Sequence, residues 1–171
     1  IVEKDEKTGA IWLKKAAQKG YRFSQSMLGI LYMYGRGVAR NLKTAVQWFR
    51  LAAEQGDDDA EFHLGVAYYY GEGVAKDYKG ALKWFRLAAE QGHAQAQGLL
   101  SVMYLLGRGV SEDKIYAYMW ARLAANNGSK KAQKLRFRME GDMMPAQLRF
   151  AKKLAFDCFQ RQYRSCYKNS I

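Results

Sequence analysis

The sequence lacks most of the features that would take a chain out of the globular class. Its 171 residues include one proline and 16 glycines, which excludes collagen-like and proline-rich disordered proteins. It contains no run of the ~18 uncharged apolar residues that a membrane-spanning helix needs. A charged-then-apolar leader is also absent, but the chain opens with Ile1, so we expect a processed chain or a fragment and conclude nothing about export.

Residues that carry catalysis or bind metals are scarce as well. Neither His63 nor His93 has cysteines or acidic residues at a metal-ligand spacing, and no set of nucleophile, base and orienting group is present. The Gly-x-Gly pairs follow no predicted strand and precede no Lys-Ser/Thr, so helix termination explains them better than nucleotide binding. The sequence therefore predicts no enzyme, no cofactor, no metal site and no small-molecule substrate.

Acidic residues are fewer than basic ones, and the difference lies at the two ends of the chain. The net charge is +12, with +5 in residues 1–41, −1 in 42–128 and +8 in 129–171. A solvated helical surface is the simplest interpretation of the basic C-terminal end. The alternative is a surface that binds nucleic acid or an anionic lipid or glycan.

An internal repeat of 36 residues determines the predicted fold. Glycines and tryptophans recur at this spacing without a shift of register, at Gly20, Gly56, Gly92 and Gly128 and at Trp12, Trp48, Trp84 and Trp120. Apolar residues at helical spacing predict two helices in each repeat. The first helix is expected to end at Gly35, Gly71 or Gly107, and the second to begin at an N-cap residue, Asp5, Asn41, Asp77 or Asp113.

The repeats divide the chain into one continuous predicted domain. Full repeats cover 21–56, 57–92 and 93–128, and residues 1–20 form the second helix of a truncated repeat, so we expect at least one helix upstream. After residue 128 the pattern changes, and Pro145 suits the first turn of a last helix over roughly 145–160. The apolar residues expected on one side of this helix are Leu148, Ala151, Leu154, Ala155 and Phe159. We interpret 129–171 as C-terminal capping helices.

The repeated string Leu-Gly-x-x-Tyr-x-x-Gly-x-Gly-Val, here Leu64 to Val74, and the trailing Ala-x-x-Trp-x-x-x-Ala-Ala resemble the Sel1-like repeat family. This family is related to the tetratricopeptide repeats. The resemblance implies an all-α protein, a right-handed α-solenoid of antiparallel helix pairs. It also implies a bacterial adaptor that holds another protein, in signalling, envelope assembly or contact with a host.

The resemblance further implies a binding groove lined by the first helix of each repeat. It would accept an extended or amphipathic segment with apolar anchors and an acidic end. Three tryptophans of the second helices are expected to be structural: Trp48, Trp84 and Trp120. The aligned groove positions are Phe23, Ile30, Met33, Tyr34, Phe62, Val66, Tyr69, Tyr70, Val102, Leu105, Leu106, Lys131, Lys134 and Arg138.

Cys158 and Cys166 are the only cysteines, and similar Cys-x7-Cys pairs join successive helices in the cysteine-rich branch of the family. The resemblance thus implies a disulfide and a periplasmic or secreted protein. Two free thiols in a cytoplasmic protein are the alternative.

The sequence favours a non-catalytic scaffold that binds a peptide or a protein segment in an apolar, aromatic groove. The basic surface-binding module described above is the main alternative. A structural spacer within a longer repeat array is a third.

Overall fold

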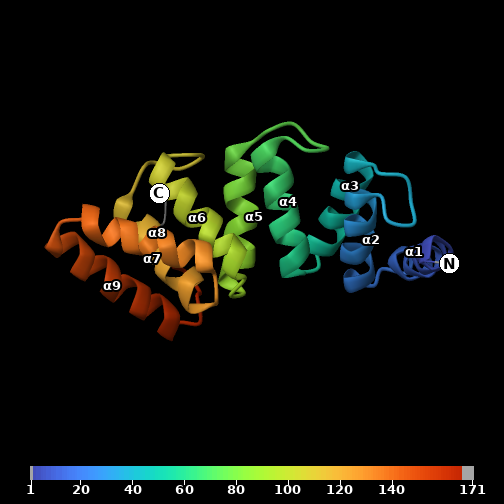
Figure 1. The fold of residues 1–171 in the computed structure, drawn as a ribbon. Coiled ribbons are helices and arrows are strands. Elements are labelled where there is room, and N and C mark those ends of the chain that lie inside the picture. Colours follow the sequence, from blue (N-terminus) through green and yellow to red (C-terminus); the bar gives the residue numbers. More distant parts are fainter. Residues whose placement is uncertain (1, 167–171) are drawn as a thin grey trace. The chain divides into compact units, whose positions relative to one another are not determined.

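Helices are the only regular elements in the part of the chain that the structure describes. The structure is a computed structural model; it describes the backbone of residues 2–166 and the side chains from residue 5 onward. Figure 1 shows the helices in sequence order. They are α1 (Val2–Gln18), α2 (Arg22–Tyr34), α3 (Leu42–Ala53), α4 (Asp58–Tyr70), α5 (Tyr78–Glu90), α6 (Ala94–Leu106), α7 (Lys114–Asn126), α8 (Lys130–Asp142) and α9 (Pro145–Gln160).

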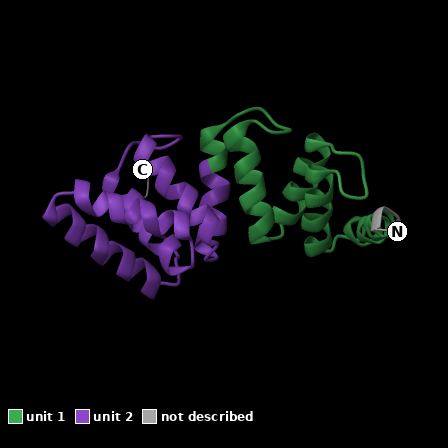
Figure 2. Ribbon diagram, viewed as in Figure 1, with its two compact units in different colours: residues 1–81 green, residues 82–171 purple. Residues whose placement is uncertain are grey.

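These helices form two compact units, coloured separately in Figure 2. Unit 1 comprises Ile1–Ala81 and unit 2 comprises Leu82–Ile171, so the division falls inside α5. In unit 1, α2 packs against α1 and α3, and α3 packs against α4. In unit 2, α7 packs against α6, α8 and α9. The all-α prediction is confirmed, and the last helix has the predicted bounds within one residue.

Glycine ends each first helix, as the sequence predicts. Gly35 and Gly71 adopt left-handed backbone angles at the ends of α2 and α4, where a residue with a Cβ is disfavoured. The second glycine of each Gly-x-Gly pair has another cause. A Cβ on Gly37 or Gly73 would collide with the backbone carbonyl of Glu6 or Leu42, in the preceding second helix. Helix termination therefore explains only the first glycine of each pair.

The second helices begin at side-chain caps. The Asn41 carboxamide accepts the amide of Thr44 at 3.0 Å, and the Asp113 carboxylate accepts the amides of Ile115 and Tyr116. The cap predicted at Asp5 is wrong, because α1 begins at Val2 and Asp5 lies within the helix.

Arginine and tyrosine side chains join α3 to α4 and α5 to α6. Arg50 donates to the hydroxyl oxygen of Tyr68 at 2.9 Å in unit 1, and Arg86 does the same to Tyr104 in unit 2. These pairs lie 36 residues apart in sequence, so the joint is part of the repeat. Within a helix pair, a Cβ on Gly29 would lie 2.6 Å from the Phe49 ring, which confirms that a small residue permits the close approach.

The tryptophans are not equally buried. Trp120 in α7 is 0% exposed, whereas Trp12 in α1 is 65% exposed. Trp48 and Trp84 are only half-buried. Of Trp48, Trp84 and Trp120, which are expected to be structural, Trp120 is the one that is fully buried: α7 has α9 packed against it as well as α6 and α8, and this additional helix increases the cover of its side chains.

The end of unit 2 is closed by a disulfide. Cys158 in α9 pairs with Cys166, with 5.3 Å between their Cα atoms. The segment between them turns back onto the repeat, because the Tyr163 hydroxyl donates to the Asn127 carboxamide oxygen at 3.0 Å. Gln162, Tyr163 and Ser165 have positive φ, a backbone conformation that costs ~1–2 kcal/mol per non-glycine residue. The disulfide and the Tyr163 contact hold this strained segment in place.

Candidate partner-binding face

Helix α2 presents apolar side chains on an accessible face. Phe23 and Tyr34 are more than 60% exposed, and Ile30 and Met33 between them are half-buried. The Arg36 guanidinium lies 5.6 Å from the centroid of the Tyr34 ring. Large exposed aromatics have little reason to lie on a monomer surface unless another molecule covers them, so this face is a candidate contact surface.

Helix α4, also in unit 1, has accessible apolar side chains as well. Phe62 and Val66 are half-buried and Tyr70 is 58% exposed. Tyr69 is buried instead, with its ring 5.2 Å from that of Tyr78. The sequence does not predict that Tyr69 is buried and Tyr70 exposed, because both are tyrosines in a helix that has apolar residues on most sides. Tyr69 belongs to the core of unit 1 rather than to an open surface.

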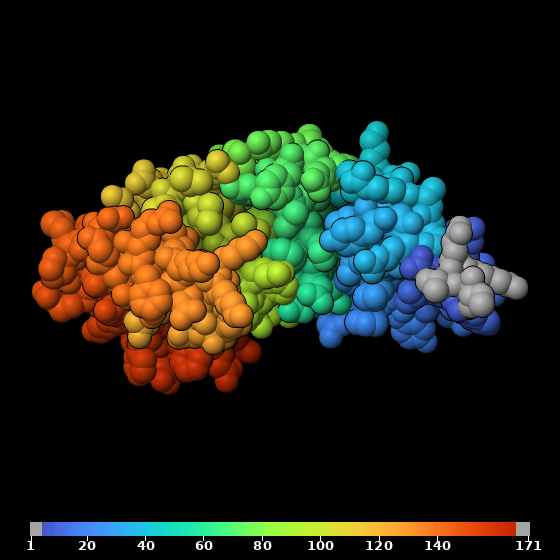
Figure 3. Space-filling model, in the orientation of Figure 1, coloured from blue at the N-terminus to red at the C-terminus, as the bar shows by residue number. Residues whose placement is uncertain are grey.

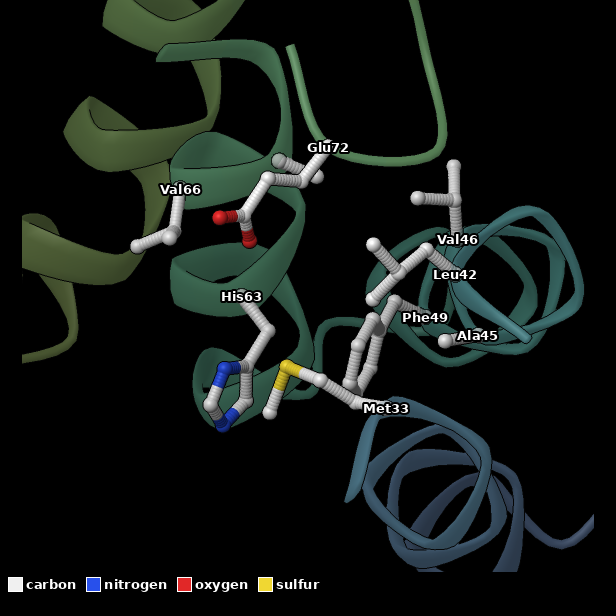
Figure 4. A pocket seen from close by; sticks show the side chains of 9 residues that line it. Met33, Leu42, Ala45, Val46, Phe49, His63, Val66 and Glu72 are labelled. Atoms are coloured by element: carbon white, nitrogen blue, oxygen red, sulfur yellow. The ribbon is translucent and has the colours of Figure 1, made fainter. Parts of the chain in front are cut away.

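A small cavity lies between α3 and α4, bordered by α2. Figure 4 shows Phe49 and Val46 of α3 on one side, His63 and Val66 of α4 opposite, and the Met33 sulfur between them. The cavity volume is about 10 Å³, the room of one water molecule or methyl group. A space of this size accepts the end of a side chain rather than a cofactor.

The wall of the cavity carries two ionisable groups. The imidazole of His63 is stacked on the Phe49 ring with 4.9 Å between centroids, and the Phe62 ring lies 5.3 Å from it. The Glu72 carboxylate, from the loop after α4, is turned toward the space between the helices (Figure 4). Apolar walls and one exposed carboxylate thus meet at this point, which we call the α2–α4 cavity.

In unit 2 the equivalent positions are less aromatic and more basic. Val102 and Leu105 of α6 are half-buried, and Leu106 is 52% exposed. The corresponding residues of α8 are all exposed and all positively charged: Lys131, Lys134 and Arg138. The orange surface in the space-filling view of Figure 3 includes this helix.

Helix α9 has an exposed face that the sequence pattern did not reveal. Phe159 was placed on the packed side with Ala151 and Ala155, but it is 50% exposed, and Phe150 and Phe156 are exposed as well. Ala151, Ala155 and Cys158 form the buried side instead. The hydrophobicity pattern alone predicts that Phe159 is buried. In the structure, α9 packs on α7 through small residues instead.

Two tyrosines of α7 have raised pKa values. Burial raises the pKa of Tyr118 above its usual value, and the hydrogen bond that its hydroxyl donates to Glu140 at 2.6 Å raises it further, against the opposing effect of Arg122. Burial, followed by the neighbouring Tyr104 and Asp113, raises the pKa of Tyr116. Both shifts favour the neutral phenol, and the neutral Tyr118 hydroxyl donates its hydrogen bond to Glu140.

Membrane-spanning helices and metal clusters are both absent from the described residues. In residues 2–166, no helix is both long enough and apolar enough to cross a bilayer. The same part of the chain contains no group of three or more histidine, cysteine, aspartate and glutamate side chains that could hold a metal ion.

Helix pairs with a 36-residue repeat define an α-solenoid, and a family comparison agrees with this class. The family model for the Sel1 repeat matches residues 1–21, 23–57, 58–93 and 94–129. The chain belongs to the Sel1 repeat family. Proteins of this family are generally non-catalytic scaffolds for protein interactions. Among proteins with curated descriptions, none matches the chain.

Solved structures of bacterial proteins are similar to the chain. A Sel1 repeat protein from Oxalobacter formigenes shares 38% identity with a TM-score of 0.74, over 78% of this chain and 54% of that one. A protective antigen present in uropathogenic Escherichia coli strains, with an SLR fold, shares 30% identity with a TM-score of 0.69, over 92% of this chain and 42% of that one.

Cysteine-rich protein B of Helicobacter pylori has the same fold at 22% identity and a TM-score of 0.62, over 79% of this chain and 97% of that one. The chain thus spans about half the length of the first two relatives and nearly all of the third.

Proposed function

We propose that this protein is a non-catalytic scaffold that binds a segment of another protein on the apolar faces of α2 and α4. The observation that carries the proposal is the exposure of Phe23, Tyr34 and Tyr70 on helices that belong to one unit. Aromatic side chains are the commonest energetic anchors of protein interfaces. Exposed aromatics on a well-packed helix also lose little conformational freedom when a partner binds, which favours affinity.

Affinity capture with a surface variant tests this proposal. The bait is the protein itself, wild type or Tyr34→Ser/Tyr70→Ser, and circular dichroism verifies that both baits are folded. Trp12→Ser is the matched control, because it removes an equally exposed aromatic from α1, outside the proposed face. We expect one captured protein to be lost with the tyrosine variant only, and its affinity, measured by calorimetry, to fall at least about tenfold.

A partner that binds wild type, the tyrosine variant and the tryptophan control equally well contradicts the proposal. If salt also removes that partner, a second candidate function gains support: binding of an anionic surface by α9. The observation favouring this candidate is that Arg149, Lys152 and Lys153 are exposed on the helix that also exposes Phe150 and Phe156. Basic residues beside aromatics suit an anionic lipid surface.

The salt dependence of binding separates the two candidates. Contacts to phosphate groups weaken steeply as ionic strength rises, whereas contacts to apolar aromatics change little. Vesicles with and without phosphatidylserine, mixed with wild type or with a Lys152→Gln/Lys153→Gln variant, provide the direct measurement. Binding that needs both the anionic lipid and the two lysines would favour the second candidate.

We also propose that the protein works outside the cytoplasm, in the periplasm or after secretion. The disulfide between Cys158 and Cys166 supports this location, because disulfides persist in oxidising compartments. Alkylation of the protein taken from its native cells, without reductant and followed by mass spectrometry, gives the test. Both cysteines should remain unmodified; complete alkylation would instead indicate a reducing compartment.

A further inference from the structure

Helix α4 of the proposed face lies in a segment whose charge is opposite to that of the whole chain. Between Arg50 and Lys76 the sequence has six acidic residues and no lysine or arginine, although the chain carries a net charge of +12. This segment includes all of α4 and the first part of the loop that follows it, up to Ala75. The acidic region therefore coincides with one element of the candidate face rather than with an unrelated surface.

The acidic residues bracket the apolar side chains of α4. Asp59, Phe62, Val66 and Tyr70 are spaced at intervals of three and four residues, so they fall on one side of the helix, within an arc of about 80°. Asp59 is exposed at the beginning of this stripe, and Glu72 is exposed just beyond its end. We call these five residues the α4 stripe.

Glu72 differs from its counterparts in the neighbouring repeats. The residue between the two glycines is Arg36 in the preceding repeat and Arg108 in the following one. The Glu72 carboxylate is turned toward the α2–α4 cavity, whose other walls include Met33, Val66 and Phe49 (Figure 4). The Glu72 carboxylate is exposed at the edge of these apolar walls, so a cation that reaches it can pack its aliphatic part on them.

From this arrangement we infer that the segment bound by unit 1 is basic: it presents an apolar side chain to the α4 stripe and a lysine or arginine to Glu72. The inference rests on the proposed function and names the chemistry of the partner. The aliphatic stem of a lysine or arginine packs on Val66 and Met33, while its charged end reaches the carboxylate. The cavity accommodates the last methyl group of the neighbouring apolar anchor.

This chemistry differs from the expectation drawn from the sequence, which gave the partner an acidic end that meets Lys131, Lys134 and Arg138. Those residues lie in unit 2, whereas the exposed tyrosines and the acidic segment both lie in unit 1. The charge next to the α4 part of the aromatic face is therefore negative, and complementarity there requires a positive partner, whereas Arg36 lies beside Tyr34 at the end of α2.

A peptide selection on the purified protein tests the inference directly. A phage library of random dodecapeptides is selected on wild type at physiological ionic strength, and the affinity of the most enriched peptide is measured by fluorescence anisotropy. We expect enrichment of lysine or arginine within four positions of a bulky apolar residue. Replacement Glu72→Arg should weaken that peptide about tenfold, and Glu72→Gln about threefold.

The control variant is Glu54→Arg, which makes the same change of net charge at an exposed residue just after α3, outside the α4 stripe. It should leave the affinity within about twofold, because an exposed and distant charge is screened by salt. If Glu54→Arg and Glu72→Arg weakened the peptide equally, the attraction would depend on net charge and not on the position of Glu72, which would overturn the inference.

Two other outcomes are distinct. Peptides that need Tyr34 and Tyr70 but have no excess of basic residues overturn the inference and leave the proposed function standing. Peptides that ignore the Tyr34→Ser/Tyr70→Ser variant, or no enrichment at all, overturn both. Sedimentation must also give a monomer at micromolar concentration; self-association abolished by Glu72→Arg would identify the basic end of a second copy as the occupant and overturn the inference.

Discussion

The same repeat gives different results in the two units. In unit 1, Trp12 is exposed and the face of α2 and α4 carries open aromatics, whereas in unit 2 the equivalent Trp120 is buried in a helix that has three helical neighbours. The difference shows that a repeat sequence specifies a helix pair and its joints. How deeply each side chain is buried depends on what packs against that pair.

The two units also differ in what stabilises them. Unit 1 contains close backbone contacts that recur 36 residues apart, at Gly37 and Gly73. Unit 2 contains the additional helix α9 and the disulfide. Variants that change one of these features alone test whether the two units differ in the way described.

The largest difference is expected between equivalent tryptophans. Trp120→Ala should lower the free energy of unfolding by ~3–5 kcal/mol, because it leaves a cavity in a fully buried site. Trp12→Ala should change it by less than about 0.5 kcal/mol, as exposed substitutions usually do. Urea unfolding followed by circular dichroism measures both. If the two variants lost similar free energy of unfolding, the difference in burial between Trp12 and Trp120 would not affect stability.

The second expected effect concerns the Gly-x-Gly loop of unit 1. Gly73→Ala should cost about 2–4 kcal/mol, because the new Cβ collides with the Leu42 carbonyl and the backbone angle is left-handed. Gly56 has a similar angle but open space around it, so Gly56→Ala should cost only about 1 kcal/mol. Thermal unfolding midpoints compare the two; equal shifts would mean that conformation alone, and not the close contact, requires glycine at 73.

Removal of the disulfide is expected to affect unit 2 only. Cys158→Ser/Cys166→Ser should lower stability by about 2–3 kcal/mol, because the unfolded chain regains the loop entropy that the disulfide removes. Hydrogen exchange should become faster around Asn127, which accepts the Tyr163 hydroxyl. Amides of unit 1 are the internal control, and faster exchange there to the same extent would contradict a local role.

The smallest effect is predicted at a buried glutamate of unit 1. Gln25 and Gln97 donate from their carboxamides to the carbonyls of Ala17 and Ala89 at 3.1 Å, and Glu61 stands at the equivalent position of the middle repeat. Glu61 is 3% exposed. Glu61→Gln supplies the amide donor of the other repeats and removes a buried carboxyl, so it should stabilise by ~1 kcal/mol.

A urea titration of the Glu61→Gln variant at neutral pH measures that change. Gln25→Glu is the reverse substitution and should destabilise by a similar amount, which tests whether the position has the same requirement in each repeat. A destabilised Glu61→Gln protein would show that the middle repeat uses the carboxylate itself.

Much of the fold followed from the sequence, because each prediction rested on a local rule. The bounds of α9 followed from Pro145, and the ends of α2 and α4 followed from Gly35 and Gly71. The groove positions were identified by alignment of the repeats, and most of them are accessible. Tyr69 and Phe159 were misplaced, because their burial depends on helices that lie elsewhere in the chain.

The repeat length, the helix pairs and their caps could be predicted from the sequence, as could the excess of basic residues at the two ends. Each of these features depends on residues that lie close together in the chain. Only the tertiary structure decided which tryptophan is buried, which tyrosine is open, and that the Glu72 carboxylate meets an apolar cavity between α3 and α4. The physical reason is that burial and local charge arise from neighbours in space, and 36 residues separate one repeat from the next.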